Sequence, residues 1–115
     1  MAHIRVDKKW GHEIVFHNEG YCSKLLVYTK RVASSKHYHE KKHETFVVLS
    51  GEFFIEWEML DDPSCRGARK FHPGQCLILE PRTVHHVRCL VEGIIVEASS
   101  EDDPADCVRL VPSEG

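Results

Sequence analysis

Two histidines separated by a single residue give this sequence its clearest chemical signal. His37 and His39 would point to the same side of a β-strand, because side chains at positions i and i+2 share one face. Glu44 opens the next apolar run, and an antiparallel return of the chain would bring its carboxylate opposite the two imidazoles. His85 follows much later, in an apolar run of its own. Side chains from several strands of a closed sheet would thus converge on one point.

This combination of side chains is suited to a transition metal. Imidazole nitrogens with one carboxylate are good ligands for zinc, manganese, iron, nickel or cobalt. The predicted ligands of one divalent transition metal are His37, His39, Glu44 and His85. His43 and His86 stand beside two of them, and strand alternation directs immediate neighbours to the opposite face. We therefore expect His43 and His86 to face solvent or to pack outside the site.

The elements that would position these ligands are short strands. Apolar runs rich in β-branched and aromatic residues alternate with turn signals, and no segment keeps a 3.6-residue period over three turns. The expected strands cover 14–16, 25–28, 45–49, 52–59, 76–79, 84–91 and 94–96. We predict an all-β barrel or sandwich of about eight short antiparallel strands in one domain, 1–115. We expect the acidic stretch 99–106 to be a surface excursion with one helical turn.

Composition narrows the classes of partner. Hydrophobic residues make up 42% and charged residues 29%, with a net charge of −3, which is ordinary for a globular domain. A nucleic-acid-binding protein would need a basic excess, and no apolar run approaches the ~18 residues that span a membrane. The five cysteines form no CxxC pair, so we expect free thiols. Because the first residues also lack the apolar core of a signal peptide, we expect a cytoplasmic protein with no nucleic-acid or membrane partner.

The spacing of the candidate ligands resembles the two motifs of the cupin superfamily. The run HxHx4Ex6G from His37 to Gly51 resembles the first motif, and the run Gx5EPRx2H from Gly74 to His85 resembles the second. The resemblance implies a jelly-roll barrel, with the four matching side chains as metal ligands near one mouth. This sequence differs from the motifs at three positions that carry no ligand: Arg31, Arg82 and Cys89. These differences affect the expected geometry of the turns more than the expected metal binding.

A narrower resemblance reaches most of the chain. The stretches 8–13, 21–26, 37–45 and 97–103 are similar to small cupins of sugar metabolism. That group resembles the type II mannose-6-phosphate isomerase domain, related sugar isomerases, and modules attached to sialic-acid synthases. The implied activity is metal-dependent interconversion of an aldose and a ketose, with a sugar or sugar phosphate as the partner. Function here is implied by resemblance, since a fold alone does not fix a reaction.

Four further residues are candidates for the reaction. We predict Glu97 and Lys24 as acid/base groups, and Arg82 and Tyr28 as groups that bind a sugar hydroxyl or phosphate. Strand alternation places Lys24 and Tyr28 on one side. In the competing interpretation Lys24, Arg82 and Glu97 are exposed residues. Lys36, Lys41 and Lys42 fit surface charge as well as they fit phosphate recognition.

Two other functions are compatible with the same ligands. An iron-dependent dioxygenase would use open metal positions for substrate and oxygen, and would consume oxygen. A non-catalytic sugar-binding accessory module would bind sugar without turnover. For either function a homodimer is reasonable, because the double aromatic Phe53-Phe54 suggests an apolar face for a second subunit.

Overall fold

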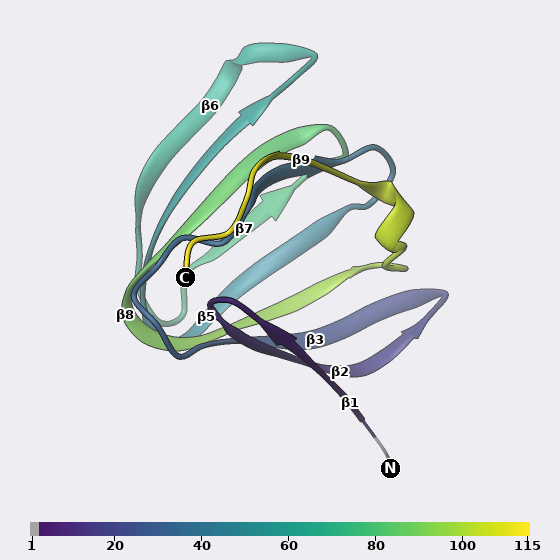
Figure 1. The fold of residues 1–115 in the computed structure, drawn as a ribbon. Coiled ribbons are helices and arrows are strands. Elements are labelled where there is room, and N and C mark those ends of the chain that lie inside the picture. Colours follow the sequence, from purple (N-terminus) through teal and green to yellow (C-terminus); the bar gives the residue numbers. More distant parts are fainter. Residues whose placement is uncertain (1–2) are drawn as a thin grey trace.

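The computed structural model describes residues 3–115 as one antiparallel sheet that curls into a barrel (Figure 1). The strands are β1 Ile4–Lys8, β2 Gly11–Glu19, β3 Tyr21–Tyr28, β4 Lys36–His39, β5 Glu44–Met59, β6 Asp62–Phe71, β7 Cys76–Leu79, β8 Thr83–Ser100 and β9 Cys107–Val111. A single 3-10 turn, η1, covers Pro104–Asp106. The all-β prediction is confirmed. No helix in the described part of the chain is long and apolar enough to cross a membrane.

The two longest strands, β5 and β8, run through the whole barrel. They pair antiparallel from Glu44↔Ser99 to Met59↔Thr83, with register shifts near the middle. Both strands bend where Gly51 faces Gly93. Gly51 has φ +79, and a Cβ on Gly93 would lie 2.1 Å from the Ser50 carbonyl oxygen, so this close crossing requires glycine. The bend lets each strand contribute to both halves of the barrel.

The strands beside β8 bring distant residues together. Its second half pairs with β3, with Lys24 opposite Glu97, and its first half pairs with β4, with His37 opposite His85. Strand β7 pairs with the first half of β5, and β6 extends the second half as a hairpin, seen at the top of Figure 1. The barrel interior is therefore reached from β3, β4, β5 and β8 at once.

The core follows the strand alternation. Phe46 and Val48 point inward as the parity with Glu44 predicts, and Phe53 and Ile55 are fully buried. Phe53 therefore packs within the chain, while Phe54 is half-buried on the other face. The main core cluster continues through Trp10, Leu26, Tyr28, Phe71, Leu77, Leu79, Val87, Cys89 and Ile95. All five cysteines are free thiols, as expected.

The acidic stretch after β8 contains one helical turn, as expected, and leads into a strand that was not predicted. It forms η1, and the chain then returns as β9, which pairs with β4 so that Cys107 lies opposite His39. The acidic residues therefore lie against the end of the barrel that carries the two histidines of β4 (Figure 1).

Candidate metal centre and its cavity

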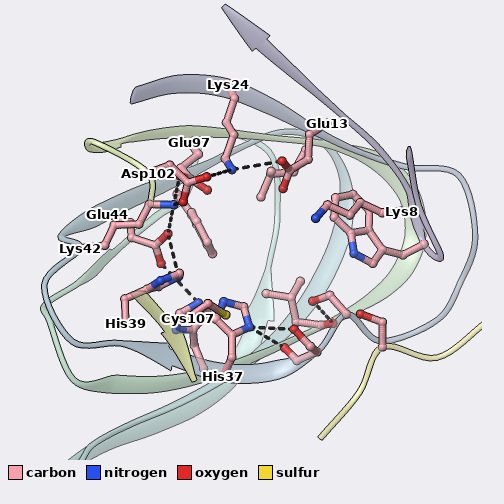
Figure 2. Close-up of a pocket in the computed structure, with 18 of the residues that line it drawn as sticks. Lys8, Glu13, Lys24, His37, His39, Lys42, Glu44, Glu97, Asp102 and Cys107 are labelled. Atoms are coloured by element: carbon pink, nitrogen blue, oxygen red, sulfur yellow. Dashed lines mark hydrogen bonds and ion pairs between the residues drawn. The ribbon is translucent and has the colours of Figure 1, made fainter. Parts of the chain in front are cut away.

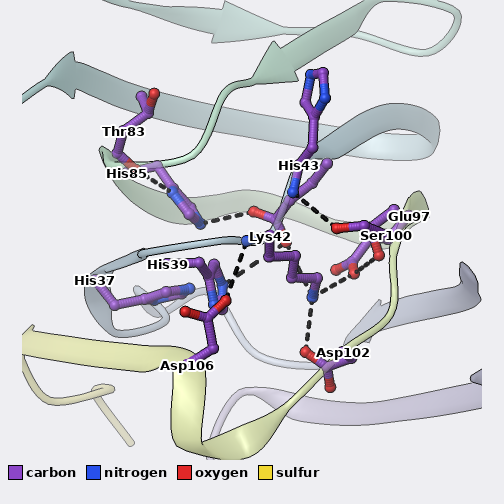
Figure 3. A network of polar contacts seen from close by, with 12 residues as sticks. His37, His39, Lys42, His43, Thr83, His85, Glu97, Ser100, Asp102 and Asp106 are labelled. Atoms are coloured by element: carbon purple, nitrogen blue, oxygen red, sulfur yellow. Dashed lines mark hydrogen bonds and ion pairs between the residues drawn. The ribbon is translucent and has the colours of Figure 1, made fainter. Parts of the chain in front are cut away.

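Three of the four predicted ligands form a compact cluster. Ring nitrogens of His37, His39 and His85 all lie within 4.8 Å of one another. The β4–β8 pairing sets His37 against His85, with ring centroids 4.4 Å apart, and His39 follows two residues along the same face of β4. The predicted convergence of imidazoles thus has a simple origin in strand register. Figure 3 shows the three rings facing a common space.

Glu44 faces the cluster from the first residue of β5. Its Oε2 lies 3.3 Å from Nε2 of His85, and its Oε1 lies 3.8 Å from Nε2 of His39. The side chain is only 3% exposed. Glu44 thus borders the three imidazoles, and imidazoles with one carboxylate are donors that suit a first-row transition metal.

Backbone contacts orient two of the imidazoles. Nδ1 of His85 lies 3.0 Å from the Thr83 carbonyl oxygen, and Nδ1 of His37 lies 3.1 Å from the Ser35 carbonyl oxygen. A carbonyl only accepts, so Nδ1 of His85 donates its proton there and its Nε2 keeps a lone pair. Nδ1 of His37 also lies 2.9 Å from Ser35 Oγ. Nε2 of His85 and Oε2 of Glu44 are buried with no hydrogen-bond partner. Two buried acceptors that face each other at 3.3 Å fit a cation bound between them.

Burial also sets the protonation state. It lowers the pKa of His37 to about 2 and that of His85 to about 4, and it lowers the pKa of His39 as well. All three imidazoles are therefore neutral near pH 7, which is the form that binds a metal. Burial, followed by the charge of Glu97, raises the pKa of Glu44 to about 7. The ammonium group of Lys42 opposes this rise but does not outweigh it.

A cavity of about 190 Å³ opens beside the cluster (Figure 2). Of the eight residues predicted for the site, seven line it: His37, His39, Glu44, His85, Lys24, Tyr28 and Glu97. The exception is Arg82, which lies outside the cavity. Its guanidinium binds Glu40 and Asp61, each at 2.9 Å. The structure thus gathers the four predicted metal ligands with three of the four other candidates.

A chain of buried ion pairs crosses the cavity. Nζ of Lys42 lies 3.1 Å from Glu44, 2.7 Å from Glu97 and 2.9 Å from Asp102. The opposite side of Asp102 faces Lys24, whose Nζ is 3.5 Å from Asp102 and 3.2 Å from Glu13. Carboxylates and ammonium groups therefore alternate from the metal ligands to the far wall (Figures 2 and 3).

Three members of this chain were missed as site residues: Lys42, Asp102 and Glu13. Lys42 fitted surface charge by its polar neighbours, yet it is 4% exposed. One signal was present in the sequence, because Lys42 has the same strand parity as Glu44. Burial disfavours the charged form of Lys42, but Glu97 and Glu44 outweigh that effect and raise its pKa. Lys42 is therefore a permanent cation in the cavity.

Lys24 and Tyr28 have defined states too. Burial alone would lower the pKa of Lys24, but Glu97 and Glu13 raise it overall, so Lys24 is a charged hydrogen-bond donor. Tyr28 stacks on Trp10 with ring centroids 4.2 Å apart, and its hydroxyl lies 3.3 Å from Ser34 Oγ. Burial raises the pKa of Tyr28, so the phenol stays neutral. Lys24 can orient a ligand by donating a hydrogen bond, and Tyr28, whose proton goes to Ser34, can accept one.

Comparison with known proteins places this architecture in a family. The cupin domain family matches residues 25–97, which is well over half of the chain. The chain belongs to the cupin family. A curated relative, the D-lyxose/D-mannose isomerase of Thermosediminibacter oceani, is 28% identical over an alignment of 115 residues that covers 81% of this chain. This chain spans 64% of the length of that relative.

Solved cupin structures share the fold. The capsular polysaccharide assembling protein CapF from Staphylococcus aureus superposes with a TM-score of 0.79 at 16% identity, over 97% of this chain and 33% of CapF. KdgF from Halomonas sp. gives 0.74 at 16% identity, over 90% of each chain. Oxalate decarboxylase from Bacillus subtilis gives 0.78 at 14% identity, over 94% of this chain and 30% of the other. The predicted cupin jelly roll is confirmed.

Proposed function

We propose that this cupin binds one divalent transition metal on His37, His39, Glu44 and His85 and interconverts an aldose and a ketose. The pair of unpartnered acceptors, His85 Nε2 and Glu44 Oε2 at 3.3 Å, carries the proposal because a bound cation would satisfy both. The similarity to a D-lyxose/D-mannose isomerase supports sugar isomerisation as the reaction class.

The charges of the ion-pair chain favour a bound cation. The chain contains two ammonium groups and four carboxylates: Lys24, Lys42, Glu13, Glu44, Glu97 and Asp102. Because uncompensated buried charge is costly, this excess of carboxylates favours a cation beside Glu44. Lys8, Arg109 and Asp103 add further charges to the cavity wall.

The metal, when bound, would polarise the carbonyl and the adjacent hydroxyl of an open-chain sugar. It would so ease removal of the proton on the carbon that carries this hydroxyl. Glu97 is the proposed base. Lys42 and Ser99 both contact its Oε2, at 2.7 and 2.9 Å, which leaves Oε1 to take a proton from one sugar carbon and return it to the next. Lys24 is proposed to hold a sugar hydroxyl by donating a hydrogen bond, and Tyr28 by accepting one.

The same contacts favour a sugar without a phosphate. Lys42 and Lys24 are already committed to five close carboxylate contacts, so neither is free to neutralise a phosphate dianion. Lys8 and Arg109 also line the cavity and are the cations that a phosphate would require. The cavity volume of about 190 Å³ leaves room for a small ligand.

One observation favours a second function, a sugar-binding module without turnover. The proposed base Glu97 forms an ion pair of 2.7 Å with Lys42, and Lys24 is held in its charged form. Both acid/base candidates are thus engaged in pairs. Such a cavity could bind hydroxyl groups well and still fail to move a carbon-bound proton.

A sugar panel in deuterated water distinguishes these functions. We expect the metal-loaded protein to interconvert a free aldose with its ketose, to exchange one carbon-bound proton in the NMR spectrum, and to prefer the free sugar over its phosphate. The Glu97→Gln variant should bind sugar but lose most turnover. Saturable binding without conversion by the wild type would support the accessory module instead, and oxygen consumption with ferrous ion would support a dioxygenase.

We also propose that the protein forms a homodimer through the outer face of the sheet. One registered row crosses five strands with apolar side chains only: Cys76, Val47, Val96, Leu25 and Ile14. The rows on either side add Ile78, Ile94 and Val27, and they carry no charge until Asp7 of β1. Ile78 is 61% exposed.

A second copy suits this face because a two-fold axis sets a surface against itself, where charges of one sign would repel. Arg5 and Asp7 lie at its β1 edge and pair with each other at 3.0 Å. The five adjacent strands span roughly 24 Å across the face, and the shortest of them, β7, has 4 residues.

A further inference from the structure

The turn between β4 and β5 separates two of the proposed metal ligands. His39 ends β4 and Glu44 begins β5, so residues 40–43 fix the distance between an imidazole and the carboxylate. The same turn carries Lys42, whose ammonium group contacts Glu44 at 3.1 Å. Any movement of this turn would therefore shift three groups of the site together.

One carboxylate from a distant segment binds the backbone of this turn. Oδ1 of Asp106 accepts hydrogen bonds from the amides of Glu40, at 2.9 Å, and Lys41, at 3.1 Å. Its Oδ2 accepts from the amides of Lys41, at 3.2 Å, and Lys42, at 3.0 Å. Three consecutive amides thus converge on one side chain, and Figure 3 shows Asp106 beside Lys42. Hydrogen bonds to an ionised acceptor are about twice as strong as neutral ones.

The position of Asp106 is itself well determined. It ends η1 and immediately precedes β9, where Cys107 pairs with His39. The next amide of the turn, that of His43, donates to Ser100 Oγ at 3.0 Å, so the end of β8 completes the same enclosure. The segment from Ser100 to Cys107 therefore holds the turn from both of its ends.

We infer that Asp106 is a positioning residue for the metal centre. Its carboxylate fixes the backbone of residues 40–42, and through that backbone it sets where His39, Lys42 and Glu44 point. It does not touch the metal or the sugar. This inference rests on the proposed metal site. Groups that orient metal ligands typically contribute about 10–100-fold to metal affinity.

Cobalt(II) titration of the purified chain tests the inference. We expect Asp106→Ala to weaken cobalt binding by about 10–100-fold, with a change in the visible absorption of the bound cobalt. Asp106→Asn keeps one carbonyl oxygen and loses the other acceptor, so its affinity should fall between those of the wild type and the alanine variant. Hydrogen exchange of the Glu40, Lys41 and Lys42 amides, measured on the metal-free proteins, should be faster in both variants.

Asp103→Asn is the matched control. It removes the same charge three residues earlier, and its only side-chain hydrogen bond, to the amide of Ala105 at 3.0 Å, can be kept by asparagine. It should bind cobalt like the wild type. Folded Asp106 variants with unchanged cobalt affinity, or with a loss no greater than that of Asp103→Asn, would overturn the inference alone. A wild type that binds no metal would overturn the proposed metal site as well, even if the amide exchange changes as expected.

Discussion

Nζ of Lys42 lies 3.1 Å from Oε1 of Glu44, and each side chain is only 3% exposed. A buried ammonium group therefore stands directly beside a proposed metal ligand. The same nitrogen contacts Glu97 and Asp102 at 2.7 and 2.9 Å, so one cation ties the metal centre to the proposed base and to the segment after β8. Removing one partner from such a buried group leaves the others uncompensated.

Replacing Lys42 with methionine should therefore destabilise the protein. We expect Lys42→Met to lower the free energy of unfolding by about 3–5 kcal/mol, because three carboxylates would lose their shared cation. Lys41→Met is the control, since Lys41 is the exposed neighbour with no side-chain ion pair among the described contacts. Its effect should stay within about 0.5 kcal/mol. Urea unfolding measures the free energy of unfolding of both variants. Equal losses would show that Lys42 does not stabilise the ion-pair chain.

The stability of the metal-free protein should fall as the pH is lowered from 7 to 5. Burial lowers the pKa of His37 to about 2 and of His85 to about 4, against 6.5 in the unfolded chain. Below pH 6.5 the unfolded state binds these protons first, so their contribution is present above 6.5 and is lost on acidification. Each excess proton of the unfolded state contributes a slope of about 1.4 kcal/mol per pH unit.

Glu44 opposes this trend in part. Its pKa is raised from 4.5 to about 7, so the folded state takes up one proton before the unfolded state does. The several histidines still outnumber this one carboxyl, and the net slope keeps its sign. Chemical denaturation at a series of pH values should show a shallower slope for His85→Gln than for the wild type. Constant or rising stability between pH 7 and 5 would contradict the buried neutral state of the cluster.

The proposed dimer gives a prediction about mass. The wild type should sediment at twice the chain mass of 13.2 kDa, and Val96→Lys, at the centre of the apolar row, should sediment at the monomer mass. Leu110→Lys changes an apolar residue of β9 that is 52% exposed and lies outside the face, so it should leave the dimer intact. A monomeric wild type at micromolar concentration, or a dimer that survives Val96→Lys, would contradict the proposed interface.

The sequence permitted a detailed prediction wherever local rules decide the outcome. Strand parity places His37 with His39, and it places Phe46 and Val48 inside the barrel with Glu44. The motif spacing added His85, whose contact with His37 depends on pairing across 48 positions of the chain. Local periodicity alone cannot supply such a partner. The resemblance to cupins could, because it carries information about the closed fold.

The missed residues share one cause. Lys42 lies in a short polar turn, and its burial depends on Glu97 and Asp102, which reach it from far along the chain. Asp106 was placed in a surface excursion, because nothing nearby in the sequence indicates that its carboxylate binds the backbone of residues 40–42. Arg82 is the opposite case, because it was predicted for the site and lies outside the cavity. Its surface partners Glu40 and Asp61 keep it away from the cavity that it was predicted to serve.

The metal content of the purified chain tests the central proposal most directly. Protein prepared without chelators and equilibrated with manganese, iron, cobalt, nickel or zinc should retain about one ion per chain after desalting. His85→Ala should lose it, because the imidazole that faces Glu44 at 3.3 Å is gone, whereas His43→Ala, which alters an exposed histidine beside the site, should retain it. A folded wild type that retains none of these metals would contradict the account.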